Sequence, residues 1–166
     1  RASNVEVGYL RLVGEGGTSL VSFQTANALD NIRLHDLFID MRYNDDPTRD
    51  SRGIDFANRR GGTGTTRMGT SISSTATAYL ENITFWSNGA NGEALLLATC
   101  TVAMKNLRFH NDAGTWATPM AVATSVDQSY GDNLVFTSSG TMTVCVSGPQ
   151  HNYAVDTADS LYLTNS

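Results

Sequence analysis

The residues best suited to chemistry in this 166-residue chain lie between positions 42 and 67, where six of its eleven basic residues and several carboxylates gather. Two carboxyl groups a few ångströms apart, one protonated and one ionised, are what acid-catalysed cleavage of a glycosidic bond requires. Arginines beside them could hold carboxylated sugars or neutralise a uronate in a lyase reaction. The candidate catalytic residues are Asp50, Asp55 and Glu93, and the candidate substrate-binding residues are Arg42, Asp45, Asp46, Arg49, Arg52, Arg59, Arg60 and Trp86.

The same residues also have a purely structural explanation. The run from Asp45 to Asp50, with Pro47 inside it, is typical of a solvated turn, and exposed Asp–Arg pairs contribute little to stability. Arg59-Arg60-Gly61-Gly62 fits a flexible basic loop equally well. The segment therefore predicts a catalytic site, a glycan-binding site without catalysis, or a structural or subunit contact.

A short phrase that recurs along the chain indicates which elements position these residues. It consists of an Asn, finally a Ser, followed by an apolar residue, any residue and a second apolar residue. It occurs at Asn31, Asn82, Asn106, Asn133 and Ser160, with a weaker copy at Asn4. The intervals are 27, 51, 24, 27 and 27 residues. A period in the twenties with a two-residue alternation inside it indicates a solenoid of stacked strands.

The clearest repeat unit ends at Asn106. Residues 94–99 and 101–105 predict two strands, Asn106 a tight corner, and residues 107–110 a third strand. Asn suits a corner because it tolerates the left-handed backbone conformation and its amide can bond to neighbouring groups. Stacked once per unit, such residues predict a ladder of side-chain hydrogen bonds, with inward apolar residues one and three positions after each corner.

This corner-and-strand pattern covers nearly the whole chain and resembles the right-handed parallel β-helix of pectate lyases, polygalacturonases and phage tailspikes. The predicted fold class is therefore all-β, a right-handed parallel β-helix with coils of about 24–27 residues and one expanded coil, formed by residues 1–166 as one segment. Handedness follows from the resemblance and from the general right-handedness of parallel crossovers. A β-sandwich is the alternative fold, but the Asn-Gly hairpin signal occurs only at Asn88 and Asn91.

The 51-residue interval is the irregular one. It could be two coils, one of them without an Asn corner. We favour a single coil with two insertions because one good inner strand, residues 53–57, lies between its corners. Ile54 and Phe56 should point inward, which would place Asp55 on the floor of a groove walled by the flanking loops. Glu93, at the start of the next inner strand, would lie about one coil from Asp55.

The repeat also predicts a column of outward side chains four residues after each corner. Its members are His35, Trp86, His110, Thr137 and Thr164. Because coils stack roughly 4.8 Å apart, His35, Trp86 and His110 should touch in succession. Trp86 could serve as a sugar-stacking platform; the alternative is an ordinary outer column or a subunit contact. No metal site is expected, since two histidines without carboxylate or cysteine partners do not make one.

Composition narrows the class of partner. The net charge of −5 argues against a generic surface for nucleic acid or anionic membranes. The longest apolar run, residues 94–98, has the length of a strand rather than of a membrane span. Cys100 and Cys145 fall in different phases of the repeat, which favours two separate thiols over a disulfide. No cofactor is expected, because neither glycine-rich segment carries the Gly-Lys-Ser/Thr of a phosphate loop.

Among β-helix proteins, the chain resembles most a phage tailspike or related virion adhesin, in its Ser/Thr/Asn/Gly-rich composition, acidic balance and loose repeat. The resemblance implies a homotrimer, located on the virion tail or outside the cell, that recognises bacterial capsular or lipopolysaccharide glycan and, as a depolymerase, cleaves it. Because the repeat runs to both ends without a cap, the chain is expected to be a piece of a longer protein.

Two other function classes stay open at this stage. One is a monomeric secreted polysaccharide lyase or glycoside hydrolase. The sequence lacks the Asn-Thr-Asp, Asp-Asp and Gly-His-Gly set of polygalacturonases in register, and the Arg-Pro-Gly segment of pectate lyases. The other is a non-catalytic β-helical shaft or adhesin passenger.

Overall fold

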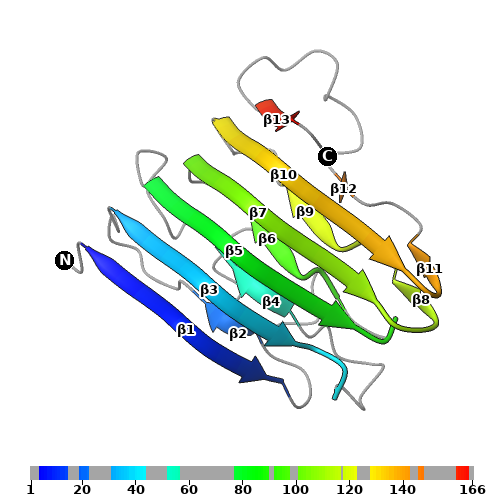
Figure 1. Cartoon of the computed structure of the whole chain (residues 1–166). Coiled ribbons are helices and arrows are strands. Elements are labelled where there is room, and N and C mark those ends of the chain that lie inside the picture. The colour runs from blue at the N-terminus through cyan, green and yellow to red at the C-terminus, as the bar shows by residue number, and fades with distance from the viewer. Residues whose placement is uncertain are drawn as a thin grey trace, which may run out of the picture.

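A computed structural model of the chain consists of parallel β-strands (Figure 1). It describes residues 4–14, 19–22, 31–43, 52–56, 77–89, 92–97, 101–116, 118–122, 128–142, 146–147 and 160–164. Within these residues every regular element is a strand and every strand pairing is parallel. The predicted all-β class with parallel strands is confirmed.

The largest sheet has six strands that lie side by side in chain order (Figure 1). These are β1 (Val5–Val13), β3 (Ile32–Asp40), β5 (Thr77–Ser87), β7 (Thr101–Asn111), β10 (Gln128–Ser138) and β13 (Ser160–Thr164). The strand predicted for residues 101–105 and the one predicted for residues 107–110 are thus joined in β7. Neighbours in this sheet are separated in the chain by a strand of a second sheet.

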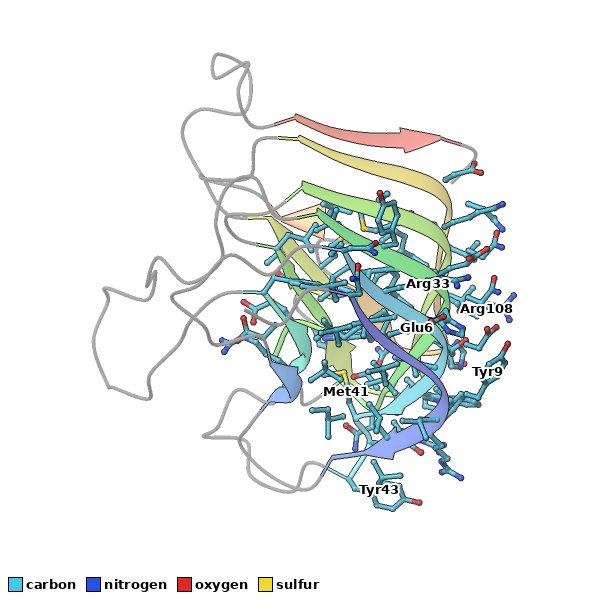
Figure 2. The ribbon with its side chains drawn as sticks, turned by 90° about the vertical axis from the view of Figure 1, so that its left-hand side faces the viewer. Glu6, Tyr9, Arg33, Met41, Tyr43 and Arg108 are labelled. Atoms are coloured by element: carbon cyan, nitrogen blue, oxygen red, sulfur yellow. The ribbon has the colours of Figure 1, made fainter. Side chains whose placement is uncertain are left out.

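The second sheet is shorter and forms the opposite layer (Figure 2). Its strands are β2 (Ser19–Ser22), β4 (Arg52–Asp55), β6 (Leu95–Leu97), β9 (Met120–Val122) and β12 (Val146–Ser147). A two-stranded sheet joins β8 (Thr115–Trp116) to β11 (Thr141–Met142). Asn88-Gly89 does not close a hairpin, because β5 and β6 belong to different sheets.

The core lies between the two larger sheets. Ile83 and Leu107 from the six-stranded sheet and Ile54 and Leu95 from the five-stranded sheet are at most 1% exposed and belong to one apolar cluster. Phenylalanines at one level of β5, β7 and β10 stack, with ring centroids 4.9 Å apart for Phe85–Phe109 and 4.7 Å apart for Phe109–Phe136. Such stacking is possible because parallel strands in register place equivalent side chains directly above one another.

Each long strand contains one residue in the left-handed conformation. Asn82, Asn106 and Asn133 have φ between 54° and 55°, and the pairing of β5, β7 and β10 skips these residues. The predicted Asn corner is therefore confirmed, but it lies inside a long strand rather than between two. The left-handed residue shifts the side-chain alternation by one position, so that apolar residues on both sides of it face the core.

The predicted ladder of side-chain hydrogen bonds is also confirmed. The Nδ2 group of Asn106 donates to Oδ1 of Asn82 at 2.9 Å, and Asn133 donates to Asn106 at 2.9 Å. Asn82 in turn donates to Oδ1 of Asp36 at 3.1 Å, which lies 46 residues earlier in the chain. Asp36, with φ 51°, is thus the corner of β3.

The predicted position of the repeat was wrong at Asn31 and at Ser160. Ile32 pairs with Ala78, so Asn31 stands five residues before the corner level of Asn82. Ser160 pairs with Gln128 and likewise precedes the level of Asn133. Asn31 donates instead to Asn4 at 2.7 Å, in a second and shorter ladder. The error arose because two similar phrases follow one another here, one led by Asn31 and one by Asp36, and both bury their apolar residues. Only the first begins with the Asn that defines the repeat.

The long interval before Asn82 is therefore 46 residues from corner to corner rather than 51. Since β3 pairs directly with β5, this interval adds no further strand to the six-stranded sheet between them. Among the described residues of the interval, β4 is the one strand in the second sheet, as predicted. The predicted burial of Ile54 and Phe56 is confirmed, since both are 0% exposed.

We expect the corner conformation to make a measurable contribution to stability. Asn106→Ala should lower the free energy of unfolding by about 2 kcal/mol, because Ala is strained at positive φ and makes neither ladder bond. Asn106→Gly should cost less, since Gly accepts this backbone conformation. The neighbouring exposed Lys105→Ala is the control and should change the value by less than about 0.5 kcal/mol. Denaturant unfolding measures all three; equal losses for Ala and Gly would contradict the account.

Candidate functional site

The structure describes five of the eleven predicted site residues. Outside the described residues lie Asp45, Asp46, Arg49, Asp50, Arg59 and Arg60, as do Cys100 and Cys145. Of the loops predicted to wall a groove, only residues 41–43 and 52 are described. The remaining five residues fall into two places: Arg52 and Asp55 in β4 with Glu93 shortly before β6, and Arg42 just after β3 with Trp86 near the end of β5.

Arg52 joins two of the three predicted catalytic carboxylates, Asp55 in β4 and Glu93 shortly before β6. Its Nε donates to Oε2 of Glu93 at 2.8 Å, and its Nη1 lies 3.7 Å from Oδ2 of Asp55. The side chains of Arg52 and Asp55 are 7% and 2% exposed, whereas that of Glu93 is 24% exposed. The predicted proximity of Asp55 and Glu93 thus holds through a shared arginine. A catalytic role for either carboxylate stays a prediction.

The outward row at the ends of the long strands contains Asp40, Trp86, His110 and Thr137, which pair in succession. The predicted neighbourhood of Trp86, His110 and Thr137 is confirmed. His35 was wrongly included, because it pairs with Glu81, and Thr164 was wrongly included, because it pairs with Asp132. Both errors follow from the misplaced corners at Asn31 and Ser160.

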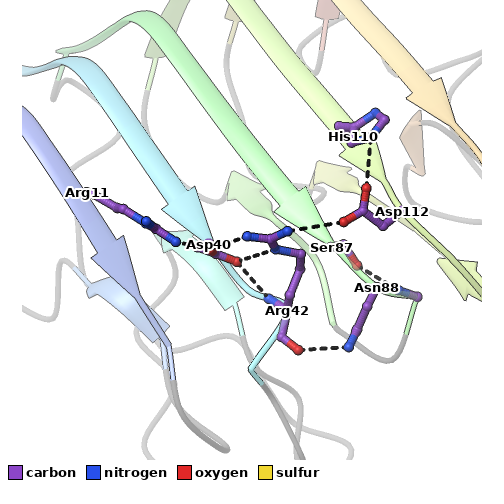
Figure 3. Close-up of polar contacts among 8 residues, drawn as sticks. Arg11, Asp40, Arg42, Ser87, Asn88, His110 and Asp112 are labelled. Carbon is purple, nitrogen blue, oxygen red and sulfur yellow. Dashed lines mark hydrogen bonds and ion pairs between the residues drawn. The ribbon is translucent and has the colours of Figure 1, made fainter.

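Arg42 is the centre of a polar network on this row, which we call the Arg42 cluster (Figure 3). Its members are Arg11, Asp40, Arg42, Trp86, His110 and Asp112. Arg42 donates from Nε to Oδ1 and from Nη2 to Oδ2 of Asp40, both at 2.8 Å. Its Nη1 donates to Oδ2 of Asp112 at 3.3 Å. Two parallel bonds to one carboxylate fix the guanidinium plane.

Asp40 anchors the cluster. Its side chain is 0% exposed and accepts a further hydrogen bond from Nη2 of Arg11 at 2.8 Å. The hydrogen bonds from Arg42 lower the pKa of Asp40 to about 2, with burial acting in the opposite direction and Arg11 adding to the lowering. A buried carboxylate with this many charged donors stays ionised at neutral pH and keeps Arg42 in place.

Trp86 lies within this framework rather than as an open platform. The Arg42 guanidinium covers its ring, 4.5 Å from the centroid, in a cation–π arrangement. The ring of His110 meets it edge-on with centroids 5.0 Å apart, and Phe38 lies 5.4 Å away. The aromatic surface is thus oriented by its neighbours, and Trp86 itself is half-buried.

His110 links Thr137 to Asp112. Its Nδ1 lies 2.7 Å from Oγ1 of Thr137, and its Nε2 lies 3.1 Å from Oδ1 of Asp112. Burial acts to raise the pKa of Asp112, but the nearby side chains of Trp86, Arg42 and His110 outweigh burial and lower it. Asp112 was not among the predicted site residues, although its position two residues after His110 places it near the same face of the strand.

A second histidine, His35, is held by two carboxylates and is 7% exposed. Its Nε2 lies 3.0 Å from Oε1 of Glu6 and its Nδ1 lies 2.7 Å from Oδ2 of Asp36. The His35 ring fills the space beside Gly8. A Cβ atom at position 8 would lie only 2.4–2.8 Å from atoms of that ring, so a larger residue would clash with it. His35 is thus part of the packing between β1 and β3. In the described residues, no group of three His, Cys, Asp or Glu side chains is placed to hold a metal ion.

Comparison with known proteins found no matching family model, no similar curated protein and no similar solved structure. The part of the chain that the structure describes contains no helix that is long and apolar enough to cross a membrane.

The ionisation of Asp40 should be visible in the acid stability of the chain. Because its folded pKa of about 2 lies below the ordinary value of 3.8, its contribution is complete above that value and is lost as the pH falls towards 2. We expect the wild-type free energy of unfolding to lose about 2 kcal/mol through this carboxylate over that interval. Asp40→Asn should be less stable at neutral pH and should lack this part of the acid dependence.

Thr115→Ala, an exposed residue on β8 outside the Arg42 cluster, is the control and should keep the wild-type acid dependence. Unfolding free energies measured at intervals between pH about 2 and 7 test the difference. If the free energy of unfolding changed with pH in the same way for wild type and Asp40→Asn, Asp40 would not be the source of the loss of stability in acid.

Proposed function

We propose that this chain is a segment of a right-handed parallel β-helix. Three observations support the proposal: the chain passes alternately between a six-stranded and a five-stranded parallel sheet; stacked Asn residues occupy equivalent corners; and the corner interval is 24 or 27 residues outside the expanded region. Right-handedness is the general rule for parallel crossovers.

We further propose that the segment belongs to a phage tailspike or related virion adhesin and binds bacterial capsular or lipopolysaccharide glycan. The observation that carries this is the Arg42 cluster, in which an aromatic ring, a guanidinium and a carboxylate share one outward row. The indole supports the Arg42 guanidinium, and the paired polar groups beside it can orient hydroxyl or carboxylate substituents of a sugar. Because Asp40 and Asp112 hold Arg42 in place, binding a sugar would order few further side chains.

The wider setting of the proposal is a homotrimer on the virion tail or outside the cell. It rests on the resemblance of the sequence to tailspikes. Sedimentation or light scattering of the purified chain tests the trimer directly, and a monomer would favour the secreted-enzyme alternative.

A second candidate function is polysaccharide cleavage by the carboxylates on the five-stranded sheet. It is favoured by the shared contact of Asp55 and Glu93 with Arg52. Asp55→Asn and Glu93→Gln should then abolish release of reducing ends, or of unsaturated uronate detected by ultraviolet absorbance. Cleavage at the wild-type rate by both variants would rule out this site.

Glycan binding should depend on Trp86. We expect Trp86→Ala to weaken binding of a responsive capsular or lipopolysaccharide glycan at least about tenfold, since the Arg42 guanidinium loses the ring that it packs on. Trp86→Phe should retain part of the affinity. Tyr79→Ala is the matched control, because Tyr79 is a 45%-exposed aromatic residue on the same strand but outside the Arg42 cluster.

Titration calorimetry against a panel of purified surface glycans measures these affinities, with circular dichroism confirming that each variant is folded. Equal affinities for Trp86→Ala and Tyr79→Ala would place binding elsewhere. Absence of wild-type binding to the whole panel would overturn the proposed function.

A further inference from the structure

We propose that Thr137, His110 and Asp112 form a nucleophilic site that hydrolyses carboxylic esters. Thr137 Oγ1 is 2.7 Å from His110 Nδ1, and Asp112 Oδ1 is 3.1 Å from His110 Nε2. A hydroxyl hydrogen-bonded to an imidazole that is oriented by a carboxylate is the arrangement by which enzymes activate a weak nucleophile. It is recognised by geometry and not by the order of the residues in the chain.

The direction of the hydrogen bonds fits this role. A carboxylate can only accept, so Nε2 of His110 donates to Asp112 and carries the proton of the neutral ring. Nδ1 is then unprotonated and accepts from the Thr137 hydroxyl. The ring is thereby held as the tautomer that can remove a proton from Thr137.

Asp112 is itself held from two sides. Arg42 donates to its Oδ2 at 3.3 Å, and the backbone N–H of Asp112 donates to the carbonyl oxygen of Ser87 at 2.9 Å. Arg42 is fixed in turn by its two bonds to Asp40. The buried side of the network thus positions the carboxylate, and the lowered pKa of Asp112 is consistent with its staying ionised.

The reacting groups face solvent. Thr137 is exposed, and the His110 side chain is 26% exposed. Arg108, two residues before His110 on β7, points away from the sheet on its outer side (Figure 2) and makes no ion pair within the described residues. Its strand neighbour on β10 is Val135, so it lies diagonal to Thr137, within the reach of a long side chain. We assign to Arg108 the role of stabilising the ester carbonyl oxygen, which becomes negatively charged when Thr137 attacks the carbonyl carbon.

The reaction proceeds in two stages. The Thr137 oxygen bonds to the ester carbonyl carbon while its proton moves to Nδ1 of His110. The bond from that carbon to the alcohol oxygen then breaks, and the alcohol leaves with the proton from His110. Water next attacks the carbonyl carbon of the acyl-Thr137 ester and gives one proton to His110. The bond from that carbon to the Thr137 oxygen then breaks, the Thr137 oxygen takes the proton from His110, and the carboxylic acid is released. No oxidant, metal or cofactor is consumed.

A soluble chromogenic ester, p-nitrophenyl acetate, tests the proposal without any glycan, so that its failure is separate from a failure of glycan binding. We expect wild type to exceed the solution rate and Thr137→Val to reduce kcat/KM at least about hundredfold. Thr137→Val keeps the β-branched shape and replaces the hydroxyl by a methyl group. Thr137→Ser should retain activity, and Asp112→Asn and Arg108→Ala should each lower kcat. Thr115→Ala, an exposed threonine on β8, is the control and should match wild type.

Acetylation of Thr137 distinguishes a catalytic role of this residue from a purely structural one, because a structural residue would not become acylated. With Cys100 and Cys145 replaced by Ser in every variant, brief reaction and acid quenching should leave one acetyl group on the peptide that contains Thr137. Mass spectrometry should find none there in Thr137→Val. A wild-type rate equal to that of Thr137→Val, or acetylation only at other residues, would overturn the proposal.

Discussion

The structure depends on one residue per long strand that adopts the left-handed backbone conformation. At Asp36, Asn82, Asn106 and Asn133 this residue is skipped by the strand pairing, so the alternation of side chains is shifted by one position. Apolar residues before and after it then face the same core, although strict alternation would send one set outward. The side-chain ladder joins these positions across neighbouring strands and satisfies polar groups that the corner would otherwise leave to water. The position of this residue in each long strand therefore determines which outward side chains are neighbours on the outer face.

The same register assembles the Arg42 cluster. Because the corner of β3 is Asp36, it is Asp40 and not His35 that stands beside Trp86. Asp40 is buried and needs charged partners, and Arg42 satisfies it while also covering the indole and reaching Asp112. The charges of this region are therefore engaged with one another in a fixed arrangement.

Much of the fold could be predicted from the repeat, because Asn82, Asn106 and Asn133 each precede apolar residues at the spacing that a core requires. The assignment failed at Asn31, because the true corner of this strand is an Asp five residues later, followed by the same apolar spacing, and only strand pairing identifies it. Of the site, Trp86, His110 and Thr137 were predicted as a row because local spacing sets their level. The contact of Arg42 with Asp112 joins residues 70 positions apart and leaves no local pattern, so the sequence alone could not indicate it.

Cross-linking between β3 and β5 tests the register most directly. In a background with Cys100→Ser and Cys145→Ser, Arg33→Cys/Tyr79→Cys places two thiols on directly paired residues, about 5 Å apart between strands. Arg33→Cys/Thr84→Cys, which the Asn31 alignment would pair, separates them by about 16 Å along the strand. Dibromobimane, which becomes fluorescent when it bridges two nearby thiols, should label the first pair and not the second. Fluorescence from the second pair alone would contradict both the register and the site built on it.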